Sequence, residues 1–194
     1  EWGMAPFNVR LGLTHWTEVG IFISPYVRST ATATGWRERS SGFGDVTLRG
    51  KFNIAGNDGG GFAWGLMADL KLPTAAAGLG NDKYEGALTL PVAFELGGGW
   101  GGGAMTSVEM IYTGAGRHRA VWSNTLTVGR DLSENVGGYV ELTSSAGDGT
   151  HIATCNAGLT RALGANAQLD CGINVGISRA APDLQLFAGI SRRF

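Results

Sequence analysis

Charged side chains at alternating positions are the residues of this sequence with the clearest chemistry to offer. Segments before residue 73 place mainly basic side chains on one face of each predicted strand, namely Arg10, Arg28, Arg49, Lys51 and Lys71, joined by Asp45 and Asp69. Later segments place acidic side chains in equivalent positions, namely Glu85, Glu95, Glu109, Glu141 and Asp170. If both sets face one interior, a basic wall opposes an acidic wall, and such a field orients dipolar solutes and selects ions. The competing interpretation is that these charges pair across a narrow interior and close it.

Hydrolytic chemistry has weaker support in the sequence. It requires a nucleophile or an activated water beside a positioned base. His118 and His151 are candidate bases, and His151 has Ser144 and Asp148 nearby in sequence. The glycine-rich stretch at 56–61 lacks the spaced acidic ligands of a calcium loop, and the three histidines are scattered. We therefore predict no enzymatic activity, no metal site and no cofactor.

Composition limits the classes of protein to consider. The 194 residues include 33 glycines but only 5 prolines, a balance that suits strands and tight turns more than long helices. The 15 basic and 16 acidic residues nearly cancel, so no overall field recruits nucleic acid, and we expect no nucleic-acid partner. No stretch reaches the roughly 18 apolar residues that a membrane-spanning helix needs. A membrane protein with this sequence must therefore cross with strands.

Period-two alternation of apolar and polar residues recurs along the whole chain. Between Tyr84 and Leu96 one face is entirely apolar, whereas the other carries Glu85, Thr89 and Glu95. Counted in this way, the sequence predicts eleven strands. They lie near residues 6–14, 18–29, 44–54, 62–73, 84–96, 102–113, 119–131, 135–145, 151–162, 166–178 and 183–194. Most are longer than the roughly five or six residues of a globular-protein strand and match tilted membrane-spanning strands.

The connections and the aromatic residues indicate two different ends. Counted back from the C-terminus, alternate connections are short, as at 163–166 and 130–135, whereas the others are longer on average, as at 74–83 and 29–44. Aromatic residues fall near both predicted rims, with Trp16, Trp64, Trp100 and Phe194 at one and Trp36, Tyr84, Tyr112 and Trp122 at the other. Short periplasmic turns, long external loops and two aromatic girdles are typical of bacterial outer-membrane barrels. We therefore predict an all-β, antiparallel up-and-down transmembrane β-barrel, with a soluble β-sandwich as the fallback.

Strand parity adds a further expectation. Bacterial single-chain barrels have an even number of strands with both termini periplasmic. Eleven strands would leave the termini at opposite ends, so we predict a twelfth strand upstream of Glu1 in the full protein. Residues 1–194 then form a single barrel domain that lacks one N-terminal strand, with the short turns and the C-terminus in the periplasm.

Several segments resemble one known family. They are RLGLTHWTEVGI at 10–21, SGFGDVTLRGKF at 41–52, LKLPT at 70–74 and the closing stretch that begins AQLDCGINVG at 167 and ends at Phe194. Together they resemble the outer-membrane transporter family named after the meta-pathway of phenol degradation. The resemblance covers nearly the whole chain and implies export, insertion among outer-membrane lipids and a further strand before the one that holds RLGLT. It also implies that the terminal aromatic Phe194 is the signal read by the barrel-assembly machinery; other protein partners do not follow from it.

Two cysteines lie in one predicted hairpin, formed by the strands near 151–162 and 166–178. Cys155 and Cys171 are symmetrical about Leu163, which would place them opposite each other on the outward face. They could form a cross-strand disulfide, because export favours oxidation, or remain free apolar residues.

The sequence thus leads to two hypotheses about function. The first is a channel or transporter through which small solutes move passively along a polar lumen. Inward apolar side chains could form a path for hydrophobic or aromatic solutes or simply fill the interior; they are Phe22, Tyr26, Met67, Met105, Ile111, Tyr139 and Phe187. The second hypothesis is a closed structural or partner-binding barrel without transport activity.

Overall fold

The protein consists of antiparallel strands joined by turns and loops. We describe a computed structural model, which covers residues 2–3, 7–33, 36–56, 58–114 and 116–193. Its strands are β1 (Trp2–Gly3), β2 (Phe7–Gly12), β3 (Thr17–Ile23), β4 (Val27–Ala33), β5 (Trp36–Gly42), β6 (Val46–Ala55), β7 (Phe62–Leu72), β8 (Glu85–Gly97), β9 (Trp100–Tyr112), β10 (His118–Ser133), β11 (Val136–Gly147), β12 (Thr150–Ala162), β13 (Ala167–Gly176) and β14 (Leu184–Arg192). Among the described residues, no helix is long and apolar enough to cross a membrane.

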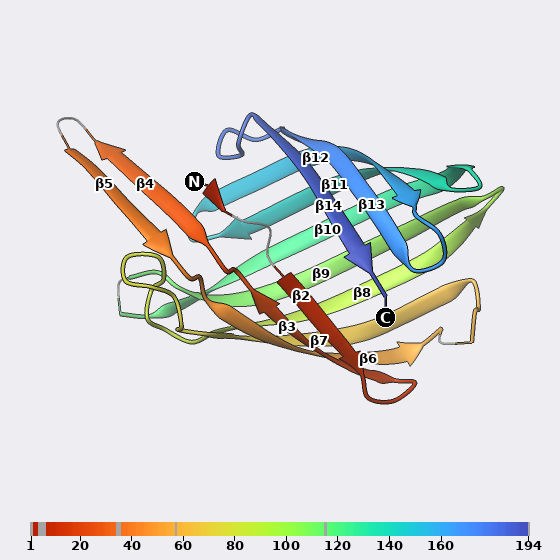
Figure 1. Cartoon of the computed structure of the whole chain (residues 1–194), viewed down its shortest axis with the longest axis horizontal. Coiled ribbons are helices and arrows are strands. Elements are labelled where there is room, and N and C mark those ends of the chain that lie inside the picture. The colour runs from red at the N-terminus through yellow and green to blue at the C-terminus, as the bar shows by residue number, and fades with distance from the viewer. Residues whose placement is uncertain (1, 4–6, 34–35, 57, 115, 194) are drawn as a thin grey trace.

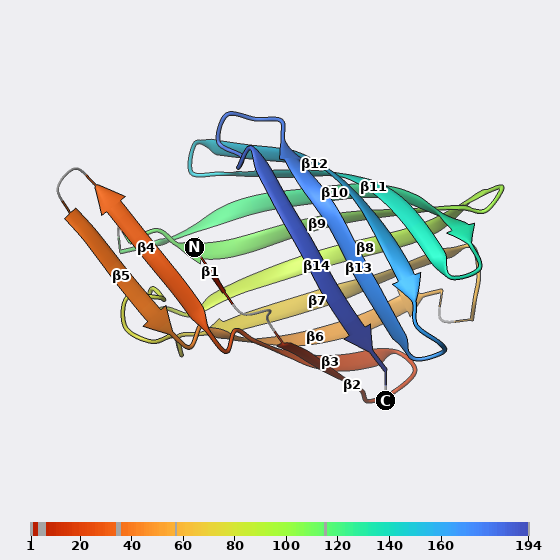
Figure 2. The same ribbon diagram turned by 45° about the horizontal axis from the view of Figure 1, so that its top comes forward.

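Eleven of these strands form one continuous antiparallel sheet. The order β14-β13-β12-β11-β10-β9-β8-β7-β6-β3-β2 follows the chain without a crossover. Figures 1 and 2 show this sheet curling around on itself in the manner of a barrel wall. These eleven strands are the ones that the alternation predicted, so the all-β up-and-down architecture is confirmed.

The connections define two ends, which we name for use below. The turn end carries the connections at 13–16, 56–61, 98–99, 134–135 and 163–166, and the loop end carries the others. One predicted long loop is instead tight: β11 and β12 are joined by Asp148 and Gly149, with positive φ angles of 50° and 75°. Two such residues form the hairpin turn whose twist matches that of the flanking strands, and Asp-Gly adopts it readily.

The segment from residue 18 to residue 44 differs from the expectation of one long strand followed by a loop. β3 ends at Ile23, and the chain bends around Ser24 and Pro25 before β4 begins. β4 and β5 then pair as a hairpin, and β1 pairs with the other edge of β4. Both views show this hairpin projecting from the loop end of the main sheet (Figures 1 and 2).

The sheet exposes its apolar side chains and turns its polar ones inward, the reverse of a soluble protein. Within the described residues, Ala153 is the only buried hydrophobic residue, whereas Leu186 and Ile190 are 76% and 71% exposed. Along β10, exposed positions alternate with half-buried ones from His118 to Arg130. The exposed series holds Trp122, Leu126 and Val128, so the apolar side chains point outward. This pattern suits a barrel in lipid and excludes a sandwich with an apolar core.

The edges of the main sheet are β2 and β14 in the described part of the chain. They are the first and eleventh members of an antiparallel series, so they run in the same direction. A single strand antiparallel to both could lie between them. The twelfth strand therefore remains a prediction.

Candidate functional site in the barrel interior

The strongest charged contact of the interior joins β6 to β7. Arg49 and Asp69 are direct partners in the strand register. The Nε atom of Arg49 donates to Oδ1 of Asp69 at 2.6 Å, and an outer guanidinium nitrogen donates to Oδ2 at 2.6 Å. The ring of Phe22 on β3 lies under the guanidinium, 4.5 Å from ring centroid to Cζ. A bidentate pair of this kind is geometrically fixed, so Arg49 is held against the wall by its neighbours.

A second ionic cluster anchors the loop at 73–84 to the mouth of the lumen at the loop end. The Nζ atom of Lys71 lies 2.6 Å from Oε2 of Glu85 and 3.1 Å from Oδ2 of Asp45. The other oxygen of Asp45, Oδ1, accepts hydrogen bonds from the backbone N–H groups of Thr74 and Ala75, both at 2.9 Å. Lys71 and Asp45 therefore tie the start of the loop to the wall.

The end of the same loop is held by Glu85. Its Oε1 atom accepts a hydrogen bond from Nδ2 of Asn81 at 2.6 Å and another from the backbone N–H of Tyr112 at 2.8 Å. Each carboxylate of the cluster thus serves both Lys71 and the backbone or side chains of its surroundings. The loop is thus fixed at both ends by contacts to its own side of the barrel wall.

Between these ion pairs and the next strands lies a cavity of about 440 Å³. Thr89 and Ser107 form its buried floor, with their hydroxyl oxygens 2.9 Å apart. Its lining combines the charged groups above with hydroxyl, carboxylate and apolar side chains, namely Arg49, Asp69, Lys71, Glu85, Glu109, Thr47, Thr89, Ser107, Ser123, Met67, Met105 and Ile111. The cavity is therefore amphipathic, which suits a small solute with both polar and apolar parts.

The part of the interior that starts beside this cavity at β9 and continues to β13 carries carboxylates that are hydrogen-bonded by neutral groups. Nδ2 of Asn156 donates to Oε1 of Glu141 at 2.8 Å, and Oγ of Ser123 donates to Glu109 at 3.4 Å. Asp170 faces the space above Gly189. In the described part of the chain, none of these three carboxylates forms an ion pair with a basic side chain.

This arrangement corrects the prediction of a basic wall facing an acidic wall. Arg49 and Lys71 are balanced by carboxylates on their own side of the barrel, because the register sets opposite charges next to each other. The β9–β13 side keeps its negative charge. Alternation determined the face of the charged residues on the main sheet but contained no information about their lateral neighbours.

Comparison with known proteins agrees with this architecture. Residues 8–194 match the model of a family described as the MetA-pathway of phenol degradation. The chain belongs to this family. A crystal structure of an outer-membrane channel from Pseudomonas putida F1 is similar in fold, with a TM-score of 0.67 and 15% sequence identity. The similarity covers 94% of this chain and 80% of that one. No protein of curated function matches the sequence.

The other predicted lumen residues of this MetA-pathway family member are less tightly held. Arg10 is exposed and lies 3.8 Å from Glu18. Lys51 pairs in register with Glu18 and Met67, and Glu95 lies beside Gly61 near the turn end. Arg28 is not on the main sheet, because it belongs to β4 in the projecting hairpin. Phe194 lies outside the described residues, so its role as an insertion signal stays a prediction.

Of the two alternatives left open for the cysteines of this family member, the strand register favours free thiols over a disulfide. Cys155 lies opposite Val175, and Cys171 lies opposite Leu159, so the two cysteines are four positions apart along the ladder. Both are free thiols. The hairpin closes around Gly164, with the N–H of Leu163 donating to the carbonyl of Ala167 at 2.7 Å, and its centre is therefore residue 165 instead of 163. Bridged cysteines need Cα atoms within about 7 Å, which this offset does not allow.

Two features of the lumen wall in this family member were not anticipated. Gly158 and Gly172 are covered by the rings of Tyr139 and Phe187 on the neighbouring strands, so that an added Cβ would meet ring atoms at 2.5 Å. The Thr89–Ser107 pair is the other feature. A glycine directly opposite an inward aromatic residue indicates that the ring covers the glycine. Such pairs can be recognised in a sequence only when the strand register is known.

The histidines do not assemble a hydrolytic site among the described residues. Nε2 of His151 lies 3.1 Å from Oγ of Ser144 on the outward face, and Nε2 of His118 lies 2.8 Å from the carbonyl of Tyr84. Asp148 instead pairs with Arg119. In the searched part of the chain, no group of three or more His, Cys, Asp or Glu side chains could hold a metal ion.

Proposed function

We propose that this chain is an outer-membrane channel through which small solutes move passively along the polar lumen. The observation that carries the proposal is the amphipathic 440 Å³ cavity on the inward face of a sheet whose outward face is apolar. Family membership and the fold shared with an outer-membrane channel support the location and the class of activity. No covalent chemistry or cofactor is needed for such movement.

The charge distribution gives the proposed channel a preference for cations. Because Arg49 and Lys71 are neutralised by adjacent carboxylates, the field in the lumen comes mainly from Glu109, Glu141 and Asp170. A ring or row of carboxylates favours cation passage. Met67, Met105 and Ile111 add an apolar side to the cavity and favour solutes that carry an aromatic or other apolar group.

Reversal potentials across planar bilayers in a KCl gradient test the channel proposal. Wild-type protein should conduct, with potassium more permeant than chloride, and Glu109→Lys or Glu141→Lys should shift the reversal potential towards chloride. The interchanged pair Arg49→Asp with Asp69→Arg keeps the local charge and should leave selectivity close to wild type. Arg179→Glu, on a loop outside the lumen, is the control for charge alone. Folded protein that never conducts would contradict the proposal.

The apolar side of the cavity has its own test. Benzyltrimethylammonium and tetramethylammonium carry the same fixed charge and differ by an aromatic ring. We expect Met105→Gln to reduce the permeability of the aromatic cation relative to the aliphatic one, because a polar amide then replaces the apolar surface that the ring would touch. Equal changes for the two cations would remove the support for aromatic selectivity.

The second candidate is a closed structural or partner-binding barrel. The inward rings of Phe22, Tyr139 and Phe187 favour it, because aromatic side chains can fill a narrow lumen. A silent bilayer recording would be its signature, provided that the same protein shows the folded gel mobility of a barrel. Tyr139→Ala should then open a conductance.

We further propose that the turn end and the C-terminus face the periplasm, with Phe194 read by the barrel-assembly machinery during insertion. The shorter connections at the turn end support this orientation. Cysteine scanning in a Cys155→Ser and Cys171→Ser background tests it. A cysteine at Asp148 should react with an impermeant reagent on whole cells, and one at Glu134 should not. The reverse labelling would invert the orientation.

A further inference from the structure

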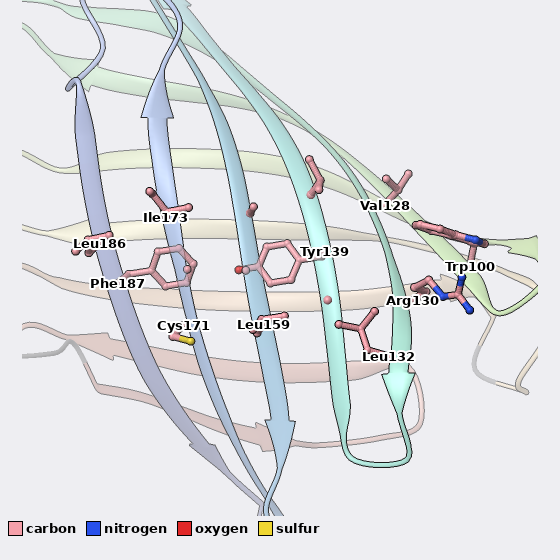
Figure 3. A pocket seen from close by; sticks show the side chains of 15 residues that line it. Trp100, Val128, Arg130, Leu132, Tyr139, Leu159, Cys171, Ile173, Leu186 and Phe187 are labelled. Atoms are coloured by element: carbon pink, nitrogen blue, oxygen red, sulfur yellow. The ribbon is translucent and has the colours of Figure 1, made fainter.

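A broad apolar groove of about 820 Å³ runs along the outward surface of β10 to β14. Its floor is formed by small residues in adjacent rows of the register, namely Gly138, Ala157 and Cys171. Larger side chains stand around them: Leu132, Leu159, Ile173 and Leu186 (Figure 3). The lumen carboxylates Glu141 and Asp170 do not line it. Four lining residues occupy inward positions, where glycine leaves the wall thin: Tyr139, Gly158, Gly172 and Phe187. Most of the lining, from Val128 to Leu186, occupies the outward positions of the register, so the groove opens on the surface that faces lipid.

One end of the groove is lined by an aromatic and a basic side chain instead of aliphatic ones. Trp100 and Arg130 are register partners on β9 and β10, and the guanidinium Cζ lies 5.2 Å from the centroid of the indole ring. Figure 3 shows the two side chains together, away from Leu186 and Phe187. A cation held over an indole is kept extended along the surface, and both side chains favour the boundary between hydrocarbon and headgroups.

Another cation occupies the outward face near the same turn end. Arg161 is two positions beyond Leu159 on β12 and lies close to Arg130 at this end of the sheet. Within the described strands β9 to β14, no carboxylate occupies an outward position of the register. Glu134 in the adjoining turn forms no ion pair with Arg130 or Arg161. The rim beside the groove is thus positively charged, while the carboxylates of these strands point inward.

We infer that this groove binds an anionic glycerophospholipid of the periplasmic leaflet, with an acyl chain along Ala157 and Leu159 and the phosphate at Arg130. An acyl chain matches the apolar lining, and guanidinium groups bind phosphate oxygens in a bidentate fork. Arg161 carries a second positive charge within the same rim. The choice of leaflet rests on the orientation given under the proposed function, whereas the site itself does not depend on solute flow.

Native mass spectrometry of the detergent-solubilised chain tests this site. The probes are palmitoyl-oleoyl phosphatidylglycerol and palmitoyl-oleoyl phosphatidylcholine, added in titration. We expect the wild type to retain the anionic lipid about tenfold more tightly, and Arg130→Gln to remove most of that difference. Ala157→Phe should weaken both lipids by filling the floor of the groove.

Matched variants separate the site from general effects. Arg179→Gln removes a cation from the loop end, and Leu142→Phe enlarges an outward side chain that does not line the groove. Both should bind like the wild type, and all variants should keep the gel mobility of the folded barrel. Equal retention of the two lipids, or a loss with Arg179→Gln as large as with Arg130→Gln, would overturn the inference.

Other occupants give different results. Arginine-dependent binding of lipopolysaccharide in preference to phosphatidylglycerol would place the phosphate source in the other leaflet and overturn the assignment. A dimer that Ala157→Phe dissociates would make a second copy the occupant instead. A silent bilayer recording combined with Arg130-dependent lipid binding would contradict the channel but leave this site intact.

Discussion

Two sides of the barrel line the same interior in different ways. On β6 to β8, basic and acidic side chains alternate between neighbouring strands, and Arg49, Asp69, Lys71 and Glu85 neutralise one another. On β11 to β14, aromatic rings cover glycines, and carboxylates are held by neutral side chains. The first side is rigid and electrically balanced, whereas the second is sterically tight and charged. Substitutions can therefore change the ion-paired geometry of the first side and the net negative charge of the second side independently.

The largest effect on stability should come from the glycines of the second side. A Cβ at Gly172 would lie 2.5 Å from the backbone carbonyl oxygen of Ala157, which cannot move aside without disturbing the ladder. Gly172→Ala should therefore destabilise the folded barrel by about 1–3 kcal/mol. Urea unfolding, followed by the loss of folded gel mobility, measures it. Gly101→Ala is the control, because nothing lies within 4 Å of its added Cβ.

Gly158 sharpens the same prediction. The three atoms nearest to its added Cβ all belong to the far end of the Tyr139 side chain, which can rotate away. Gly158→Ala should therefore lower stability less than Gly172→Ala. Combining Gly158→Ala with Tyr139→Leu should remove the loss of stability that Gly158→Ala causes. Equal costs at the two glycines would show that backbone contact is not what distinguishes them.

The next effect should come from Lys71 on the balanced side. Lys71→Met leaves Asp45 and Glu85 facing each other without their cation and frees the loop at 73–84 from the wall. We expect a loss of about 1–2 kcal/mol in stability and larger fluctuations of the open-channel current. Lys71→Arg should restore both. A quiet current with Lys71→Met would mean that the loop does not limit the opening.

A smaller difference should separate the two kinds of carboxylate. Asp69→Asn weakens the charged contact of the half-exposed Arg49 and should cost about 1 kcal/mol. Glu141→Gln loses a bond to a neutral amide and should change stability less, while lowering cation selectivity more. Unfolding and reversal potentials measured on both variants provide the check. The opposite ranking in selectivity would contradict the division between a balanced and a charged side.

The smallest expected effect concerns the thiols. Cys155 and Cys171 should stay unlinked under oxidising conditions, because their register offset keeps them apart. Mass spectrometry after alkylation of unfolded, unreduced protein should therefore find two modified thiols. An intramolecular bridge would require a different pairing of β12 with β13.

Alternation was sufficient to predict the eleven strands of the main sheet and the face of the residues on them. It works because successive side chains on a strand point to opposite sides, whatever the neighbouring strand does. The positions of Arg49, Glu109 and Asp170 on the inward face follow from that rule alone. Lateral neighbours do not, because they depend on where each turn closes. The turn at Gly164 centres the β12–β13 hairpin on residue 165, two residues from the centre assumed from the sequence. This shift separates the two cysteines along the ladder.

The projecting hairpin shows a second limit of sequence patterns. Arg28 continues the alternation of β3, yet the bend at Ser24 and Pro25 removes it from the main sheet. Proline disrupts strand pairing because it lacks an N–H donor, so it marked a break that period-two counting passed over. The anchoring of the loop at 73–84 could not be predicted from the alternation either, because its contacts join Asp45, Lys71 and Glu85 from three separate segments.

The near absence of buried hydrophobic residues in the described part of the chain has a consequence for how such a protein can change over time. A soluble core is a three-dimensional fit in which each side chain restricts its neighbours, so substitutions must be compensated. Outward positions away from the groove, such as Leu184 and Ile190, instead contact lipid chains that accept apolar groups of many shapes. Substitution among apolar residues there is nearly unconstrained. A barrel of this design can therefore keep its backbone course with very different outward side chains, as the shared fold at 15% identity illustrates.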